Sequence, residues 1–229
     1  MAILGSILRP ARLNGKLRRT FLHLDPTLDK IYFDNFAVFP QDSLPCLLSS
    51  DVKAHVGAMH PYAEMNRLLE EVPSASMLNK LLYVDMHTYL QELLMKQDQM
   101  SMAASIESRV PFLDHELCEF TALMPERLKL RGLTTKWILR ESMKDLLPPE
   151  ILQRPKMGFP VPLAQWFRGP FRWVVDEYVL SAAATRRGIF DNAFVAQLVK
   201  RHQSGAENNA QRLWALVNFE IWCRRFIEP

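Results

Sequence analysis

Apolar residues recur at helical intervals along most of this chain, and prolines separate many of the segments that show this spacing. Helices are therefore expected over residues 26–39, 43–48, 61–71, 76–96, 116–124, 136–147, 171–184, 192–202 and 207–226. Asp114 stands where an N-cap is expected, as does Thr134 or Thr135 for a later helix. No run has the pattern of a strand, and the strand–helix alternation of a parallel sheet is missing. The sequence predicts a mainly α fold.

Length and patterning suggest how the chain is divided. Its 229 residues suit one large domain or two small ones. We expect a helical N-terminal segment over residues 1–75 and a second helical portion over residues 76–229. Residues 9–19 form a basic arm without acids. A solvated helix face is the usual meaning of such an arm, and contact with phosphates or a membrane surface is the alternative.

Composition narrows the class of protein. The net charge of +3 is small, and no nucleic-acid-reading motif accompanies the basic arm, which argues against DNA or RNA binding. Cys46, Cys118 and Cys223 lie far apart, as free thiols of a reducing compartment do. We find no signal peptide and no apolar run of the roughly 20 residues that a membrane span requires. The sequence predicts a cytoplasmic protein without a membrane segment.

The stretch Asp98–His115 reads D-Q-M-S-M-A-A-S-I-E-S-R-V-P-F-L-D-H. It places the charged residues Asp98, Glu107 and Arg109 among small and apolar neighbours. Charged groups in such surroundings are costly to bury unless they are paired. The residues alone therefore leave two interpretations open, a buried ion network and a functional site.

Two further segments stand out. Residues 154–162 read R-P-K-M-G-F-P-V-P, lack helical or strand periodicity, and are expected to form a loop that leads to Trp166. Residues 136–140 read K-W-I-L-R at a predicted helix start. The six histidines show no metal-ligand spacing, so no metal ligands are assigned.

These three segments together resemble the ATP-dependent synthetase domain of the asparagine synthetase family. That domain carries D-R-x-S-M-A…E-x-R-x-P-F-L-D, then K-x-x-L-R, then K-x-G-F…P…W, in the order seen here. The resemblance implies that this chain is the helical C-terminal portion of an α/β domain of the adenine nucleotide α-hydrolase type. The parallel sheet of that domain is largely absent from the sequence.

The resemblance also implies a two-step ligase reaction with ATP and Mg²⁺. ATP activates the side-chain carboxylate of aspartate as an acyl-adenylate, and ammonia derived from glutamine then displaces AMP to give asparagine. Lys156 is the expected cation at the phosphate undergoing attack, where negative charge develops. Gly158 would let the backbone turn closely under the phosphates, and Lys136 is a weaker nucleotide-binding candidate.

The same resemblance assigns the acidic and remaining basic groups. Glu107 is expected to orient the incoming amine and to accept its proton as a general base. Arg109 would pair with Glu107 or Asp98, or hold a carboxylate or phosphate in its planar fork. Asp98 and Arg140 are expected to belong to a supporting ion network. A purely structural network of Asp98, Glu107 and Arg109 remains the alternative.

Glycine spacing argues that the site is incomplete. No two of the eight glycines lie closer than ten residues, so a glycine-rich phosphate loop cannot form. The family's S-G-G-x-D-S loop has no counterpart in this sequence. The family's glutaminase domain begins Met-Cys, whereas Ala2 follows Met1 here, so we expect that domain to be missing as well. We therefore expect a chain that is inactive alone and that carries one wall of the ATP–aspartate pocket.

A different class of function also fits the sequence. The chain would then be a non-catalytic helical module, or a split subunit, that binds a partner supplying the phosphate loop. In either case the apolar faces meant for the sheet should stay exposed. Such exposure predicts a homo-oligomer or another bound partner.

Overall fold

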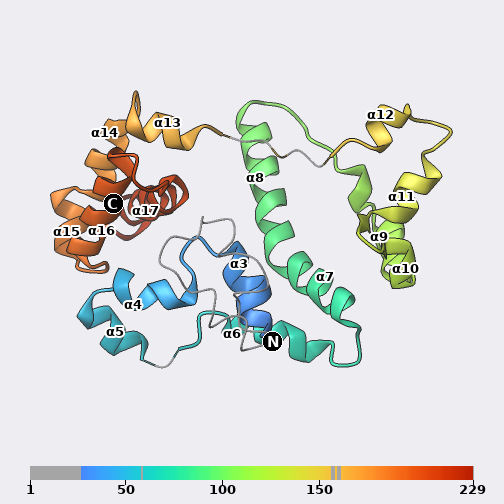
Figure 1. Cartoon of the computed structure of the whole chain (residues 1–229), viewed down its shortest axis with the longest axis horizontal. Coiled ribbons are helices and arrows are strands. Elements are labelled where there is room, and N and C mark those ends of the chain that lie inside the picture. The colour runs from blue at the N-terminus through green and yellow to red at the C-terminus, as the bar shows by residue number, and fades with distance from the viewer. Residues whose placement is uncertain (1–26, 58, 156–157, 159–160, 229) are drawn as a thin grey trace. The chain divides into compact units, whose positions relative to one another are not determined.

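A computed structural model describes residues 27–57, 59–155, 158 and 161–228 (Figure 1). This part of the chain is mainly helical, as predicted, and its strands are a single short antiparallel pair, β1 (Leu130–Arg131) and β2 (Thr134–Thr135). No helix within it is both long enough and apolar enough to cross a membrane. The basic arm at residues 9–19 lies outside the described residues.

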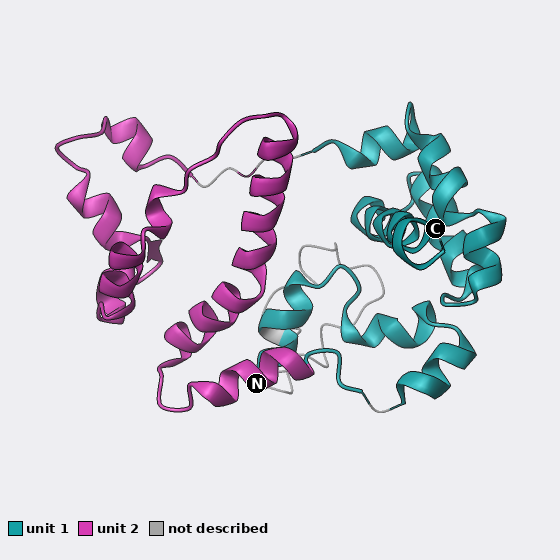
Figure 2. Ribbon diagram, turned by 180° about the vertical axis from the view of Figure 1, so that it is seen from behind, with its two compact units in different colours: residues 1–62, 159–229 teal, residues 63–158 magenta. Residues whose placement is uncertain are grey.

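The chain groups into two compact units (Figure 2). Unit 1 contains residues 1–62 and 159–229, and unit 2 contains residues 63–158. The division expected at residues 75 and 76 falls instead inside unit 2, between its first two helices.

Unit 1 consists of two stretches of helices. The first stretch holds a helical segment made of Asp29–Phe33 and α3 (Asp34–Phe36), then a 3₁₀ turn (Gln41–Ser43), α4 (Leu44–Leu47) and α5 (Ser50–Val56). The second holds α13 (Leu163–Arg168), α14 (Arg172–Val174), a π-helical turn (Val175–Val179), α15 (Ala182–Arg187), α16 (Asn192–Gln203), α17 (Ala210–Trp222) and a terminal π-helical turn (Cys223–Ile227).

An apolar core holds the two stretches of unit 1 together. The core residues are Leu47, Phe167, Val175, Val179, Val195, Val199, Leu213, Leu216 and Val217. Backbone hydrogen bonds reinforce the junction, because Ser49 N donates to Ile189 O at 3.0 Å and Asp191 N donates to Leu47 O at 2.8 Å. Leu47 is therefore fixed both by packing and by its main chain.

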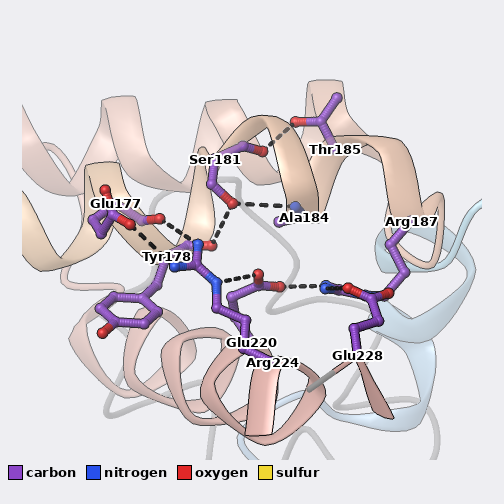
Figure 3. Close-up of polar contacts among 9 residues, drawn as sticks. All are labelled: Glu177, Tyr178, Ser181, Ala184, Thr185, Arg187, Glu220, Arg224 and Glu228. Carbon is purple, nitrogen blue, oxygen red and sulfur yellow. Dashed lines mark hydrogen bonds and ion pairs between the residues drawn. The ribbon is translucent and has the colours of Figure 1, made fainter.

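A buried carboxylate links α15 and α17 (Figure 3). Glu220 is 3% exposed and pairs with Arg187 of α15 and with Arg224, whose Nε lies 2.9 Å from Glu220 Oε1. Arg187 also holds Glu228 through two hydrogen bonds of 3.0 and 2.7 Å, and Arg224 Nη1 donates to Glu177 at 3.0 Å. These hydrogen bonds with Glu228 and Glu220 raise the pKa of the Arg187 guanidinium. The charged groups thus satisfy one another near the C-terminal ends of the two helices.

Unit 2 begins with three consecutive helices, α6 (Ala63–Glu71), α7 (Met77–His87) and α8 (Tyr89–Ala103). The single helix predicted over residues 76–96 is wrong, because the chain bends at Thr88, where φ is −122° and ψ is −81°. The Thr88 hydroxyl donates to Val84 O at 2.7 Å, a local bond that competes with the regular helical ladder. Figure 1 shows α8 leaving α7 at this bend.

The remainder of unit 2 follows α8. It contains a 3₁₀ turn (Pro111–Leu113), α9 (His115–Ala122), α10 (Glu126–Lys129), the β1–β2 hairpin, α11 (Trp137–Ser142) and α12 (Pro149–Leu152). The predicted N-cap is confirmed, since Asp114 Oδ1 accepts a hydrogen bond from Leu117 N at 3.1 Å. The helix predicted over residues 136–147 is shorter than expected, because α11 starts after its N-cap residue Lys136 and ends at Ser142.

Unit 2 has a small apolar core. Leu68 and Val84 are the hydrophobic residues that are buried among its described residues. Many large apolar side chains on α8 and in the segment that follows it are exposed, among them Phe112 of the 3₁₀ turn, Phe120 of α9 and Leu123 at the C-terminal end of α9. These side chains are uncovered in the single chain, and whether they are the faces expected to pack on a sheet stays a prediction.

Candidate active-site segments

The segment that carries Glu107 leaves α8 through a tight reversal. Ser105 has a φ of +58°, a left-handed conformation that is uncommon for serine, and Ile106 N donates to Ser101 O at 2.9 Å. The next residues are not helical, because Pro111 disfavours helix at Val110. The reversal turns residues 106–110 back beside the end of α8.

Ser108 and its two charged neighbours have different surroundings in this returning segment. Ser108 faces α8, where its hydroxyl accepts a hydrogen bond from Gln97 Nε2. Glu107 and Arg109, on either side of Ser108, are 67% and 82% exposed and form an ion pair with each other. Ser108 therefore contacts α8, whereas Glu107 and Arg109 are exposed to solvent.

The structure shows no buried ion network among the described residues of this segment. Glu107 and Arg109 are exposed, and Asp98 is exposed without an ion pair among the described residues. The sequence suggested burial because the neighbours of these residues are apolar. Those neighbours, Ile106 and Phe112 included, are themselves exposed in this chain.

Lys136 lies at the junction of the hairpin and α11. It is exposed and adopts a left-handed conformation, with φ 55° and ψ 39°, as the residue preceding the first helical turn. Arg131 of β1 stacks its guanidinium 4.9 Å from the centre of the Trp137 ring, which fixes the hairpin against the start of α11. Neither Thr134 nor Thr135 is the cap, because both belong to β2.

Arg140 binds backbone carbonyls and not carboxylates. Its Nε donates to Thr135 O at 3.2 Å, and its Nη1 donates to Leu152 O, the last residue of α12. No ion pair joins Arg140 to Asp98 among the described residues, so the expected supporting ion network does not form.

The loop predicted over residues 154–162 is described only in part. Lys156 and its neighbour Met157 lie outside the described residues, as do Phe159 and Pro160. Gly158 is exposed, and a β-carbon built on it would meet nothing within 4 Å. Nothing in these surroundings requires glycine, so close approach to a phosphate remains a prediction.

The described residues do not fit a metal site. No group of three or more His, Cys, Asp or Glu residues is placed among them to hold a metal ion.

The motif segments are not joined by polar contacts. No hydrogen bond or ion pair between described residues joins Glu107 or Arg109 to Lys136 or Arg140. Gln97 and Ser108, which orient the Glu107 segment, were missed because neither carries a charge that would single it out.

Comparisons with known proteins place these segments in a family. The Asparagine synthase family model matches residues 8–224. Asparagine synthetase [glutamine-hydrolyzing] 1 of Bacillus subtilis is 36% identical over 154 residues, which are 66% of this chain and 24% of that protein. A putative asparagine synthetase of Mycobacterium bovis is 33% identical over 152 residues, 65% of this chain and 23% of that protein.

A relative with a different name also matches. Amidase chry2 of Gibberella zeae is 30% identical over 157 residues, which are 63% of this chain and 23% of that protein. No solved structure matches the chain. The chain thus spans about a quarter of the length of these curated relatives. With its motif segments and a family model that covers nearly all of its length, the chain belongs to the asparagine synthase family.

Proposed function

We propose that this chain supplies part of the nucleotide and carboxylate pocket of an ATP-dependent amide-forming ligase. The observation that carries the proposal is that every assigned residue belongs to unit 2 of a family member, within residues 98–115, 136–140 and 154–158. The rest of the third motif segment, residues 159–162 and Trp166, belongs to unit 1. The substrate that we propose is the side-chain carboxylate of aspartate, and the nitrogen donor is ammonia released from glutamine.

The first step joins the carboxylate oxygen to the α-phosphorus of ATP and releases pyrophosphate. Negative charge develops on the phosphorus oxygens, so a fixed cation nearby lowers the barrier. We assign this role to Lys156, with Lys136 as a second cation and Gly158 as the point of backbone approach. No step through Mg²⁺ is assigned to this chain, because the described residues offer no ligand group for it.

In the second step ammonia attacks the activated carbonyl carbon and AMP leaves. The nitrogen must lose a proton as the amide forms, and Glu107 is the base that we assign. The exposure of Glu107 in this chain suits a carboxylate that awaits a substrate. Arg109, already paired with Glu107, would orient that carboxylate or bind the substrate's own carboxylate.

The exposed apolar faces of unit 2 favour a requirement for a partner. We propose that the partner is a polypeptide carrying the rest of the synthetase domain, with the phosphate loop that this sequence cannot form. The same observation supports the second candidate function, a helical module that binds such a partner without catalysing anything. Loss of activity on substitution of Lys156 separates the two.

The test is aspartate-dependent release of pyrophosphate from ATP in the presence of ammonium. This chain is mixed with the part of the Bacillus subtilis relative that precedes the matched region, and Lys156→Ala is compared with Lys144→Ala. Lys144 is an exposed lysine of the same unit, paired only with Glu141. Activity that is lost in Lys156→Ala and kept in Lys144→Ala supports catalysis, whereas equal activity of the two variants contradicts the assigned role.

A further inference from the structure

Arg140 joins three parts of unit 2 that are separate in the sequence. Its backbone belongs to α11, its Nε binds Thr135 O at the end of the hairpin, and its Nη1 binds Leu152 O at the end of α12. The side chain is partly buried between these two carbonyls. A guanidinium suits such a position, since its planar fork donates in several fixed directions at once.

The hydrogen bond from Arg140 to Leu152 O connects α12 to the part of unit 2 that precedes it in the sequence. Among the described residues, no other hydrogen bond or ion pair connects residues 149–155 to any residue before Pro148. A helix of four residues has little stability of its own. The carbonyl of Leu152 also has no partner inside α12, so a cation placed there satisfies it and complements the helix dipole.

The hydrogen bond from Arg140 to Thr135 O acts on the backbone next to Lys136. Thr135 immediately precedes Lys136, whose left-handed backbone is unfavourable for a residue with a side chain. The hydrogen bond from Arg140 Nε fixes the carbonyl just before that residue. One side chain therefore restrains both the backbone that presents Lys136 and the helix that leads to Arg154.

We infer that Arg140 is a positioning residue, which fixes the end of α12 against the hairpin and so sets the backbone at Lys136 and at Arg154, which follows α12. Its part in the reaction rests on the proposed function, since it acts through groups assigned there. The positioning itself concerns only described contacts within unit 2 and is testable without any activity.

Hydrogen exchange measured by mass spectrometry tests the positioning in the full chain. In Arg140→Ala we expect the amides of residues 151–154 to exchange about tenfold faster, the effect of losing a hydrogen bond to a charged group. Amides of α7 should be unchanged. Arg140→Lys should recover part of the protection, because an ammonium group still donates to these carbonyls. Arg127→Ala removes an exposed arginine of α10 and should change nothing.

Unchanged exchange at residues 151–154 in Arg140→Ala would overturn the inference. So would faster exchange throughout unit 2 in both Arg140 variants, because Arg140 would then be a general stabilising residue. A second assay measures pyrophosphate release with the added synthetase segment. If the wild type is active and Arg140→Ala is equally active, Arg140 has no part in the reaction. If the wild type is silent, the proposed function fails and the exchange result still decides the positioning.

Discussion

Glu220 of α17 and Arg187 of α15 form an ion pair in which the carboxylate is 3% exposed and the guanidinium 10% exposed. Arg187 also binds the half-exposed Glu228, so one arginine has a buried and a solvated partner. Burial makes the loss of one partner costly, because the charge that remains has lost solvent as well as its counter-ion. This arrangement allows a matched comparison of the two carboxylates.

Glu220→Gln should lower the free energy of unfolding by about 2 kcal/mol, since Arg187 and Arg224 both lose a buried charged partner. Glu228→Gln should lower it much less, because its carboxylate is half exposed and solvent screens the pair. Urea unfolding of the two variants gives both values. Equal effects would show that burial of Glu220 contributes nothing.

His202 should make the stability of unit 1 depend on pH. Its ring is fully buried, Nδ1 accepts a hydrogen bond from Asn209 N at 3.2 Å, and Nε2 has no partner among the described residues. Burial, together with the charge of Arg168, lowers the pKa of His202 below its ordinary value of 6.5. Below pH 6.5 the unfolded chain therefore binds a proton that the folded chain does not, and stability falls as the pH decreases.

The expected slope from His202 is at most about 1.4 kcal/mol per pH unit below pH 6.5. Urea unfolding between pH 7.5 and 5.5 measures it in the wild type and in His202→Asn, which should lose this part of the slope. His115→Asn, at an exposed position, should keep it. The same slope in the wild type and in His202→Asn would contradict the account.

The exposed apolar side chains of unit 2 should cause association. Phe120 of α9 and Leu123, the residue that caps the C-terminal end of α9, are both largely exposed. Phe120→Glu with Leu123→Glu should shift the chain toward monomer in light scattering coupled to size-exclusion chromatography. Gln91→Glu with Gln99→Glu adds the same charge at exposed positions of α8 and should not. A wild type that is monomeric at high concentration would contradict this prediction.

Glu107 should affect the second chemical step more than the first. With the added synthetase segment, Glu107→Gln should retain aspartate-dependent ATP–pyrophosphate exchange and lose amide formation by about 100-fold or more. Glu116→Gln, at an exposed position in the same unit, should change neither rate. Loss of both reactions in Glu107→Gln would place Glu107 in substrate binding or folding and not in proton transfer.

Local signals in the sequence predicted much of the fold. Asp114 marked the start of α9, and the apolar spacing of residues 192–202 agrees with α16 to within one residue. The bend at Thr88 was missed because no glycine or proline marks it. The β1–β2 hairpin was missed because strands of two residues have no periodicity, although Gly132 with φ +60° lies between them.

For the candidate site the sequence identified the segments but not their surroundings. The charged residues of 98–115 lie among apolar neighbours, which suggested burial, yet burial depends on what packs over those neighbours. Arg140 was assigned to an ion network because its charge is visible in the sequence. Its actual partners are backbone carbonyls, which every residue carries and no sequence pattern marks.

In the function proposed for it, this chain carries one part of an active site that a second polypeptide completes. Aspartate-dependent pyrophosphate release is measured for this chain alone, for the added synthetase segment alone, and for the two together. The account predicts release only from the mixture. Release by this chain alone would contradict the claim that it lacks the phosphate-binding part of the site, and no release from a mixture that forms a complex would contradict the claim that it contributes to catalysis.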